Sequence, residues 1–396
     1  MLTKNSMPDL EQLLDVLAEY LDLDDLDCLS LPPAAYLSEE LHTLELEQIF
    51  RHEWLCVGRE EYIPNTGDYY SFDLLGDSLL VIRGDDGEVR ALSNICRHRY
   101  MPLTEGKGNT RRVICPYHAW SYSTDGQLVA APYMAGSKRF DMATCRLPQY
   151  RLESWAGFLF VNFDSEAASL ASRMRTLDTH IGNYRVPGQL EIMHYESVWA
   201  GNWKLSAENS MEYYHHVGLH KDTVQVQMPA KNAYVPPPPK DLSFTHMRCG
   251  VGEEFKSADH PMNPKGNIEL FNEEELTTGY MVYIFPAFTM AMRPNGNNWL
   301  SFLPNGTEST KILGGYLVSP DLLEESPHVG DERRELIEKV NQEDALATTE
   351  LAKSMHSTQA QRGPLGPFEG TVAQFYRYLA RTLVGASTER RALRSV

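Results

Sequence analysis

Two short pairs of metal-binding side chains lie close together in the first third of this chain. Cys96 and His98 are two positions apart, Cys115 and His118 are three apart, and 16 residues separate the two pairs. Two thiolates and two imidazoles can hold a two-iron cluster, with the thiolates on one iron and the imidazoles on the other. Zinc also accepts two Cys and two His, but zinc fingers usually pair like with like, whereas each pair here is mixed. The spacing therefore favours an iron–sulfur cluster over zinc.

A second group of candidate metal ligands occurs in residues 202–220, which contain three histidines. Two His and one carboxylate form the ligand set of ferrous oxygenases, which leaves coordination positions open for dioxygen. His216 and His220 are four apart and would share one face of a regular helix. His215 and His220 are five apart and would do so only if the helix is distorted or ends there, which Gly218 favours. The spacing alone leaves both pairs open.

The carboxylate that completes such a set must come from elsewhere in the chain. Residues 332–355 predict a helix, because their apolar residues form one stripe at helical spacing. Asp344 lies about 30° from the centre of that stripe, and Glu343 about 70°. An unpaired carboxylate that points into a core is costly, so Asp344 requires a partner, which is either a basic side chain or a metal.

The residues around these ligands resemble the large (alpha, terminal oxygenase) subunits of Rieske non-haem iron oxygenases, the aromatic-ring-hydroxylating dioxygenase family. The resemblance is carried by the segments SNICRHR (93–99), CPYHAWSY (115–122), DG (125–126) and WAGFLFV (155–161). It extends from about residue 41 to residue 383 and is weakest from 222 to 275. It implies that Cys96 and Cys115 bind one iron of a Rieske [2Fe-2S] cluster and that His98 and His118 bind the other.

The resemblance also implies a separate mononuclear Fe(II). The family pattern Glu/Asp-x-Tyr-His-x4-His selects His215 and His220, and the third ligand corresponds to Asp344. The alternative is that His216 is the ligand and that His215 lies behind it.

Two further residues acquire roles from the same resemblance. Glu212 would bridge His118 of one subunit and His215 of the next, and metal-bound imidazoles do usually donate their other N–H to a carboxylate. Asn209 would lie near the iron as a hydrogen-bonding group.

The expected fold class is α+β. Short alternating strands and turns fill residues 51–165, which predicts a small all-β Rieske domain. Residues 166–396 would form the catalytic domain, an antiparallel sheet wrapped by helices, and the helical segment 1–50 would pack with it. The leucine spacing of residues 9–21 predicts an amphipathic helix there.

Composition limits the partners and the compartment. The net charge of −18 argues against nucleic acid, and no apolar run approaches the 18 residues of a membrane span. Residues 93–126 nevertheless carry a local charge of +3, which could dock an acidic redox partner or be ordinary solvated surface. No stretch resembles a secretory signal, and the four cysteines outside the cluster pairs have no disulfide spacing, so we expect a reducing cytoplasm.

The expected function is oxygenation of a small organic substrate. By resemblance, NAD(P)H electrons would arrive through a reductase, with or without a ferredoxin, because no Gly-x-Gly-x-x-Gly dinucleotide motif follows a strand here. Electron transfer between subunits would require a head-to-tail ring, and the family suggests a homotrimer. The alternatives are a Rieske electron carrier without oxygenase chemistry and a zinc-stabilised binding module.

The sequence does not identify the substrate. The reactions of the family include hydroxylation, dihydroxylation and oxidative demethylation. The pattern Glu-Asn-x-x-Glu-x-Tyr-His at 208–215 is similar to members that act on quaternary ammonium compounds, whose cation would want an aromatic cage. Residues 280–288 offer aromatic side chains for such a cage. An aromatic acid would instead want a buried Arg or Lys, which the sequence does not place.

Overall fold

The computed structural model describes residues 8–256 and 268–394. The chain divides into two compact units, one of Phe50–Met174 and the other of Met1–Ile49 with Arg175–Val396. Each is described by itself, and together they confirm the predicted α+β class, with an all-β unit and a helix-wrapped antiparallel sheet.

The unit of Phe50–Met174 is built from short antiparallel strands. Within the described residues, one sheet has the strand order β1-β10-β9-β4-β3-β2-β5 and a smaller one has the order β6-β7-β8. The strands are β1 (Leu55–Arg59), β2 (Asp68–Leu74), β3 (Asp77–Arg83), β4 (Val89–Ser93), β5 (Lys107–Asn109), β6 (Arg112–Ile114), β7 (Ser121–Ser123), β8 (Leu128–Ala130), β9 (Gln149–Trp155) and β10 (Phe158–Asn162), with one 3-10 turn, η3 (Glu60–Tyr62).

Two tight turns fix the register of this sheet. Leu75 and Gly76 join β2 to β3 with φ of 52° and 82°, and Ala156 and Gly157 join β9 to β10 with φ of 52° and 81°. A two-residue turn with positive φ at both positions is the type I′ hairpin, whose twist matches that of the strands. Each turn therefore pairs the residues that flank it, Leu74 with Asp77 and Trp155 with Phe158.

The larger unit contains one antiparallel sheet in the order β11-β17-β16-β15-β14-β13-β12, as far as the described residues extend. Every residue of β14 is buried, as expected of a central strand covered on both faces. The strands are β11 (Leu190–Ala200), β12 (Ala233–Tyr234), β13 (Phe244–Gly250), β14 (Thr278–Ile284), β15 (Phe288–Arg293), β16 (Gly296–Pro304) and β17 (Ser309–Val318).

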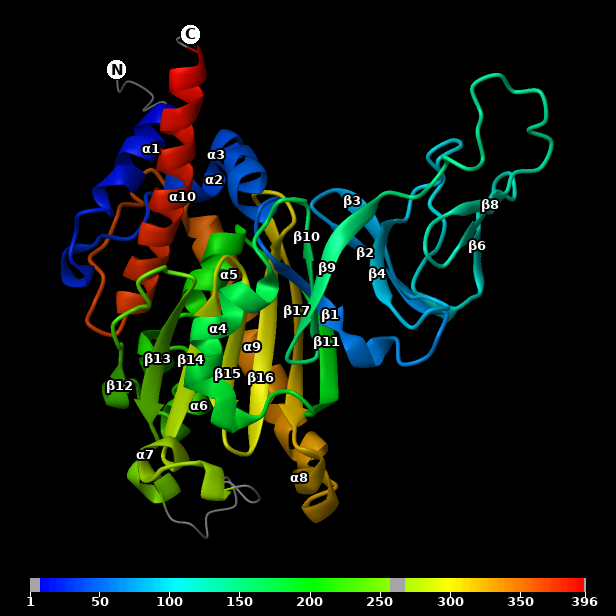
Figure 1. The fold of residues 1–396 in the computed structure, drawn as a ribbon. Coiled ribbons are helices and arrows are strands. Elements are labelled where there is room, and N and C mark those ends of the chain that lie inside the picture. The colour runs from blue at the N-terminus through cyan, green and yellow to red at the C-terminus, as the bar shows by residue number, and fades with distance from the viewer. Residues whose placement is uncertain (1–7, 257–267, 395–396) are drawn as a thin grey trace. The chain divides into compact units, whose positions relative to one another are not determined.

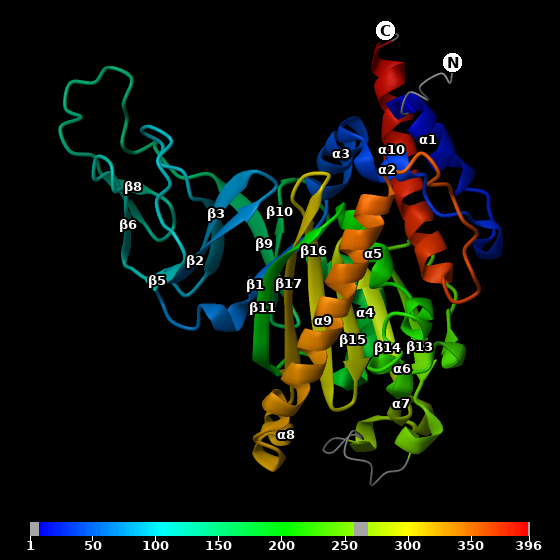
Figure 2. The ribbon, with the colours of Figure 1, turned by 180° about the vertical axis from the view of Figure 1, so that it is seen from behind.

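Helices cover this sheet. The α9 helix (Val329–Ser354) contacts β11 and α5 (Trp203–Asn209), and Figure 2 shows it lying across the sheet. The α1 (Leu10–Glu19) and α10 (Gly370–Arg394) helices pack against each other (Figure 1). The α1 and α9 helices confirm the two helices predicted from apolar spacing.

The remaining helical segments are short except α4, which has 12 residues. They are η1 (Asp25–Asp27), α2 (Pro33–Leu37), α3 (Glu39–Glu45), the π-helical turn η2 (Leu46–Phe50), α4 (Leu170–Ile181), η4 (Gly182–Tyr184), η5 (Tyr214–Val217), α6 (Val224–Gln227), η6 (Ala230–Asn232), η7 (Glu253–Lys256), η8 (Ile268–Leu270), α7 (Glu273–Leu276) and α8 (Pro320–Glu325). Within the described ranges, no helix is long and apolar enough to cross a membrane.

A buried ion pair fixes α5 to the N-terminal segment. The Nζ of Lys204 donates to Glu45 Oε1 at 2.6 Å, and both side chains are 1% exposed. The indole nitrogen of Trp203 donates to the other oxygen of Glu45 at 2.8 Å. The carboxylate is thus paired and hydrogen-bonded, which is the condition under which a buried charge is tolerated.

We expect Lys204→Met to destabilise the larger unit by about 3–5 kcal/mol, because it leaves the buried carboxylate of Glu45 unpaired. Urea unfolding monitored by tryptophan fluorescence measures the loss. The matched control is Lys353→Met, which removes an exposed ion pair to Glu350 and should cost under about 1 kcal/mol. Equal losses in the two variants would contradict the assignment.

Candidate metal centres

The two Cys–His pairs lie in loops with the same backbone hydrogen bonds. The amide of Cys96 donates to Met101 and that of Cys115 donates to Trp120, in both cases five residues later. The carbonyl of each Cys accepts from the residue four positions on, and those two residues, Tyr100 and Ala119, have φ of 55° and 58°. The sequence therefore builds two equivalent loops that each present one thiol and one imidazole.

The sulfur and nitrogen ligands differ in exposure. Cys96 and Cys115 are each 2% exposed and belong to a hydrophobic cluster with Trp120 and Tyr122. His98 is partly exposed and His118 is exposed, and their ring centroids lie 4.6 Å apart. The two thiols thus lie inside the unit, and the two imidazoles lie at its surface.

Two observations test whether an iron–sulfur cluster fits here. The Tyr122 hydroxyl accepts from the amide of Arg97, so its own hydrogen can point to the Cys96 sulfur, 3.4 Å away. Hydrogen bonds to cluster sulfurs tune the reduction potential. The Nδ1 of His98 is buried and has no hydrogen-bond partner among the described residues, as expected of an atom reserved for a metal. The residues fit the cluster.

The segment that carries the three clustered histidines is not one continuous helix. The α5 helix ends at Asn209, and only the 3-10 turn η5 follows it at Tyr214–Val217. A side chain stabilises the break, because Glu212 Oε2 accepts from the backbone amide of His215 at 3.0 Å. The break that we expected near Gly218 therefore lies nine residues earlier, and helical spacing does not decide which histidines meet.

Two of the predicted metal ligands, His215 and His220, converge on one oxygen atom of the third, Asp344. The Nε2 of His220 lies 2.9 Å from Asp344 Oδ1, and the Nε2 of His215 lies 3.8 Å from the same atom. Asn209 donates its side-chain amide to this oxygen at 2.8 Å. The predicted helix therefore brings Asp344, which is 8% exposed, to residues more than 120 positions earlier in the chain.

Each of the two imidazoles is hydrogen-bonded through Nδ1 to a different carboxylate. Glu212 Oε1 lies 2.6 Å from Nδ1 of His215, and Glu343 Oε2 lies 2.7 Å from Nδ1 of His220. Thr223 donates its hydroxyl to the same oxygen of Glu343. A carboxylate at Nδ1 fixes the tautomer and leaves Nε2 for a metal.

This arrangement fits a cation at the mononuclear centre. With Nδ1 of His220 donating to Glu343, its Nε2 can approach Asp344 only if a proton or a metal ion lies between them. Burial alone would lower the pKa of His220, but its bonds to Asp344 and Glu343 outweigh burial and raise it. The charge of one cation is therefore favoured at this position.

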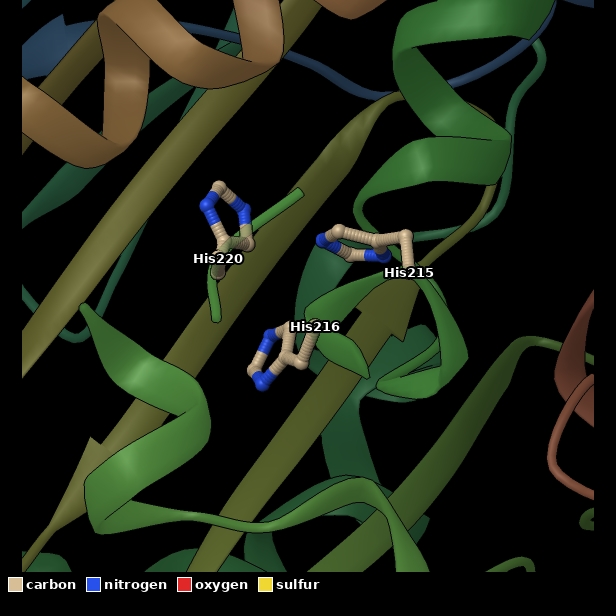
Figure 3. A group of neighbouring side chains, drawn as sticks. All are labelled: His215, His216 and His220. Carbon is tan, nitrogen blue, oxygen red and sulfur yellow. The ribbon is translucent and has the colours of Figure 1, made fainter. Parts of the chain in front are cut away.

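The third histidine, His216, lies in a different environment. The metal-binding atoms of His215, His216 and His220 lie within 4.8 Å of one another, and Figure 3 shows the three rings around a common space. Burial, together with the two neighbouring imidazoles, lowers the pKa of His216 to about 2. Its Nδ1 faces the carbonyl of Met228 at 3.4 Å, and no described carboxylate is bonded to it.

A cavity of about 210 Å³ opens at this centre. It lies between α9 and the strands β14, β15 and β16, and its lining includes His215, His220 and Asp344 together with apolar side chains such as Met281 and Ile337. An apolar cavity with a few convergent polar groups is the usual form of a small-molecule site.

Two residues near the centre were not given roles by the sequence. The sequence predicts Glu343 at the edge of the apolar stripe of its helix. Its position next to Asp344 was the only sequence feature that could have indicated a role at the metal centre. Glu208 accepts from the hydroxyl of Tyr36 at 2.8 Å, and burial raises the pKa of Glu208 to about 8. Glu208 thus fixes the end of α5 next to Asn209 without contacting the histidines in any described interaction.

Comparison with known protein families gives two matches. Residues 53–151 match the Rieske [2Fe-2S] domain, and residues 183–385, about half of the chain, match the ring hydroxylating alpha subunit (catalytic domain).

Individual relatives cover part of the chain. The oxygenase subunit of glycine betaine monooxygenase from Chromohalobacter salexigens is 35% identical over 194 residues, which are 49% of this chain and 43% of that protein. The large subunit of anthranilate 1,2-dioxygenase from Acinetobacter baylyi is 34% identical over 203 residues, 48% of this chain and 42% of that one. The chain spans about half the length of the curated relatives it matches.

Solved structures share the fold over nearly the whole chain. The quaternary ammonium Rieske monooxygenase CntA is 19% identical with a TM-score of 0.78, covering 92% of this chain and 98% of that one. Naphthalene 1,2-dioxygenase from Rhodococcus sp. is 21% identical with a TM-score of 0.77, covering 96% and 99%. Because the catalytic-domain family matches half of the chain and the Rieske domain precedes it, this protein belongs to the ring-hydroxylating oxygenase alpha subunits, the Rieske non-haem iron oxygenases.

Proposed function

We propose that this protein is the terminal oxygenase component of a multicomponent system that hydroxylates, dihydroxylates or oxidatively demethylates a small organic substrate. The observation that supports this most directly is the approach of two imidazole Nε2 atoms to one oxygen of Asp344 at the wall of a cavity. A Rieske electron carrier would need neither this group nor the cavity, and a zinc-stabilised module would need no open coordination position.

In this proposal the two centres have separate ligands. Cys96, His98, Cys115 and His118 hold the [2Fe-2S] cluster in residues 51–165. His215, His220 and Asp344 hold Fe(II) in residues 166–396, against which residues 1–50 pack. When bound, the cluster supplies single electrons and the ferrous ion activates dioxygen.

The chain's own side chains orient these ligands. Glu343 holds the ring of His220 through Nδ1, and Thr223 fixes Glu343 in turn. Asn209 donates to Asp344, which limits rotation of that carboxylate. The apolar walls of the cavity would exclude water and hold a substrate beside the centre.

Electrons would cross between subunits. The exposed imidazole of His118 is available to another chain, and Glu212 already binds Nδ1 of His215. We propose that Glu212 bridges His118 of one subunit and His215 of the next in a head-to-tail homotrimer. The reductase, or a ferredoxin, would dock at the basic surface around the cluster loops. We place the system in the cytoplasm, since no disulfide joins any of the six cysteines, all of which the structure describes.

The relatives suggest two substrate classes, quaternary ammonium compounds and aromatic compounds. Glycine betaine and carnitine are named for some relatives and anthranilate for another.

Replacing Asp344 with Ala should abolish oxygenation while leaving the cluster reducible. We expect iron content to fall from about three to about two atoms per chain, with an unchanged Rieske signal in electron paramagnetic resonance (EPR). The control is Glu350→Ala, an exposed position on the same helix. Full turnover and full iron content in the Asp344 variant would disprove the ligand assignment.

Replacing Glu343 with Gln should weaken Fe(II) binding by about 10- to 100-fold, because His220 loses the carboxylate that fixes its ring. Anaerobic titration of Fe(II) into protein that retains its cluster measures the affinity. Glu338→Gln, at an exposed position five residues earlier in α9, should leave it unchanged. An unaltered affinity in the Glu343 variant would show that the carboxylate is not needed.

Replacing Glu212 with Gln should slow electron transfer from the cluster roughly tenfold or more under single-turnover conditions, because an amide has one accepting oxygen and no charge, whereas the carboxylate offers each imidazole an oxygen of its own. Both iron centres should remain by metal analysis of the same sample. The control is Asp222→Asn, an exposed acid nearby. A normal single-turnover rate would count against the bridge.

A further inference from the structure

The cavity beside the proposed iron centre contains two arginines. Arg293 ends β15 and shares a strand face with Thr289 and Ala291, which also line the cavity. Arg333 lines it from α9, 11 residues before Asp344. Eleven residues are about three helical turns, or about 16 Å along the axis. Arg333 and the iron ligands therefore lie at opposite ends of the α9 wall.

Among the side chains that the structure describes, neither guanidinium has an acidic partner. Within residues 8–256 and 268–394, no ion pair or hydrogen bond links Arg293 or Arg333 to a described side chain. The Nε of Arg293 is buried and has no hydrogen-bond partner there. A buried N–H group without a partner is costly, because it has lost water and gained no hydrogen bond in exchange.

The two charges also act on each other. Burial lowers the pKa of Arg293, and the charge of Arg333 lowers it further. Two like charges at one end of a cavity are strongly favourable for an anion, which would neutralise both and accept their hydrogen bonds.

The opposite end of the cavity has the opposite character. Asp344 and Glu212 line it together with the histidines. The cavity therefore has acidic side chains and the proposed metal at one end, two arginines at the other, and apolar side chains such as Met281, Met292 and Val340 between them.

We propose that Arg293 and Arg333 bind a carboxylate of the substrate, so that the substrate is a small organic acid whose reacting carbon lies toward His215, His220 and Asp344. This rests on the proposed oxygenase function and narrows it. A betaine, whose quaternary nitrogen would lie at the acidic end, and an aromatic acid both satisfy it. An aromatic acid would need an arginine in the site, and the structure provides the half-buried Arg293, which the sequence did not place.

The test compares carboxylic acids with their uncharged primary amides. Isothermal titration calorimetry on the anaerobic, oxidised holoenzyme would measure the binding of glycine betaine, γ-butyrobetaine and anthranilate, each against its own amide. For at least one pair, we expect the acid to bind tenfold or more tightly than the amide. Tighter binding of the acid than of its amide in the betaine pairs would indicate a betaine substrate. The same result in the anthranilate pair would indicate an aromatic acid.

The variants assign the effect to the two arginines. Arg333→Gln and Arg293→Gln should each weaken binding of the preferred acid about tenfold or more and leave its amide unchanged. Arg333→Gln keeps the test valid if Arg293→Gln does not fold. The matched control is Arg334→Gln, the next residue on α9, whose exposed side chain pairs with Glu338 and should have no effect.

Three results would overturn the proposal: acids and amides that bind equally, an acid preference that survives both Arg variants, or no measurable binding of any of the three acids. Because binding is measured without turnover, the result does not depend on oxygenase activity. Iron analysis of the same samples shows separately whether the mononuclear centre is present. If the wild-type protein retains its mononuclear iron but binds none of the three acids, that result would count against this inference alone.

Discussion

The structure of the catalytic unit depends on bringing one carboxylate to two imidazoles that lie far away in the sequence. Asp344 Oδ1 lies 2.9 Å from His220 and 3.8 Å from His215, more than 120 residues apart in the chain. A carboxylate and imidazoles gathered in a low-dielectric cavity are unfavourable without a compensating positive charge. Beside the imidazoles, the described donor to that oxygen is the neutral side-chain amide of Asn209. A cation bound between Asp344 and the imidazoles would neutralise the carboxylate.

Rigid elements keep these groups in position. The α9 helix carries Asp344 and Glu343 on adjacent positions, so one helix supplies both a proposed ligand and the carboxylate that orients another. The α5 helix places Asn209 and is itself anchored by the buried pair of Lys204 and Glu45. Sites built on regular elements with supporting hydrogen bonds are held more closely than sites on loops. The less regular segment, residues 210–220, is fixed by Glu212 and Glu343 instead.

Part of this could be read from the sequence. The cluster loops are evident because mixed Cys–His pairs have few other uses, and α9 is evident because a stripe of apolar residues at helical spacing predicts both the helix and the inward position of Asp344. The end of α5 at Asn209 could not be predicted, because neither Gly nor Pro marks it, and the Glu212 bond to the amide of His215 is what stabilises the turn. Arg293 could not be identified either, since a lone arginine at the end of a strand is indistinguishable in sequence from a solvated charge. Pairing of Lys204 with Glu45, across 159 positions, is likewise visible only in the fold.

The central claim is that one chain holds a Rieske cluster and a separate mononuclear iron. The most direct test is iron and acid-labile sulfide analysis of the anaerobically purified wild-type protein, with EPR spectroscopy after dithionite reduction. We expect a Rieske-type signal, about two sulfides and about three irons per chain. An iron content that stays at about two atoms per chain after reconstitution with Fe(II) would mean that the protein is an electron carrier only. Bound zinc with no EPR signal would contradict the account altogether.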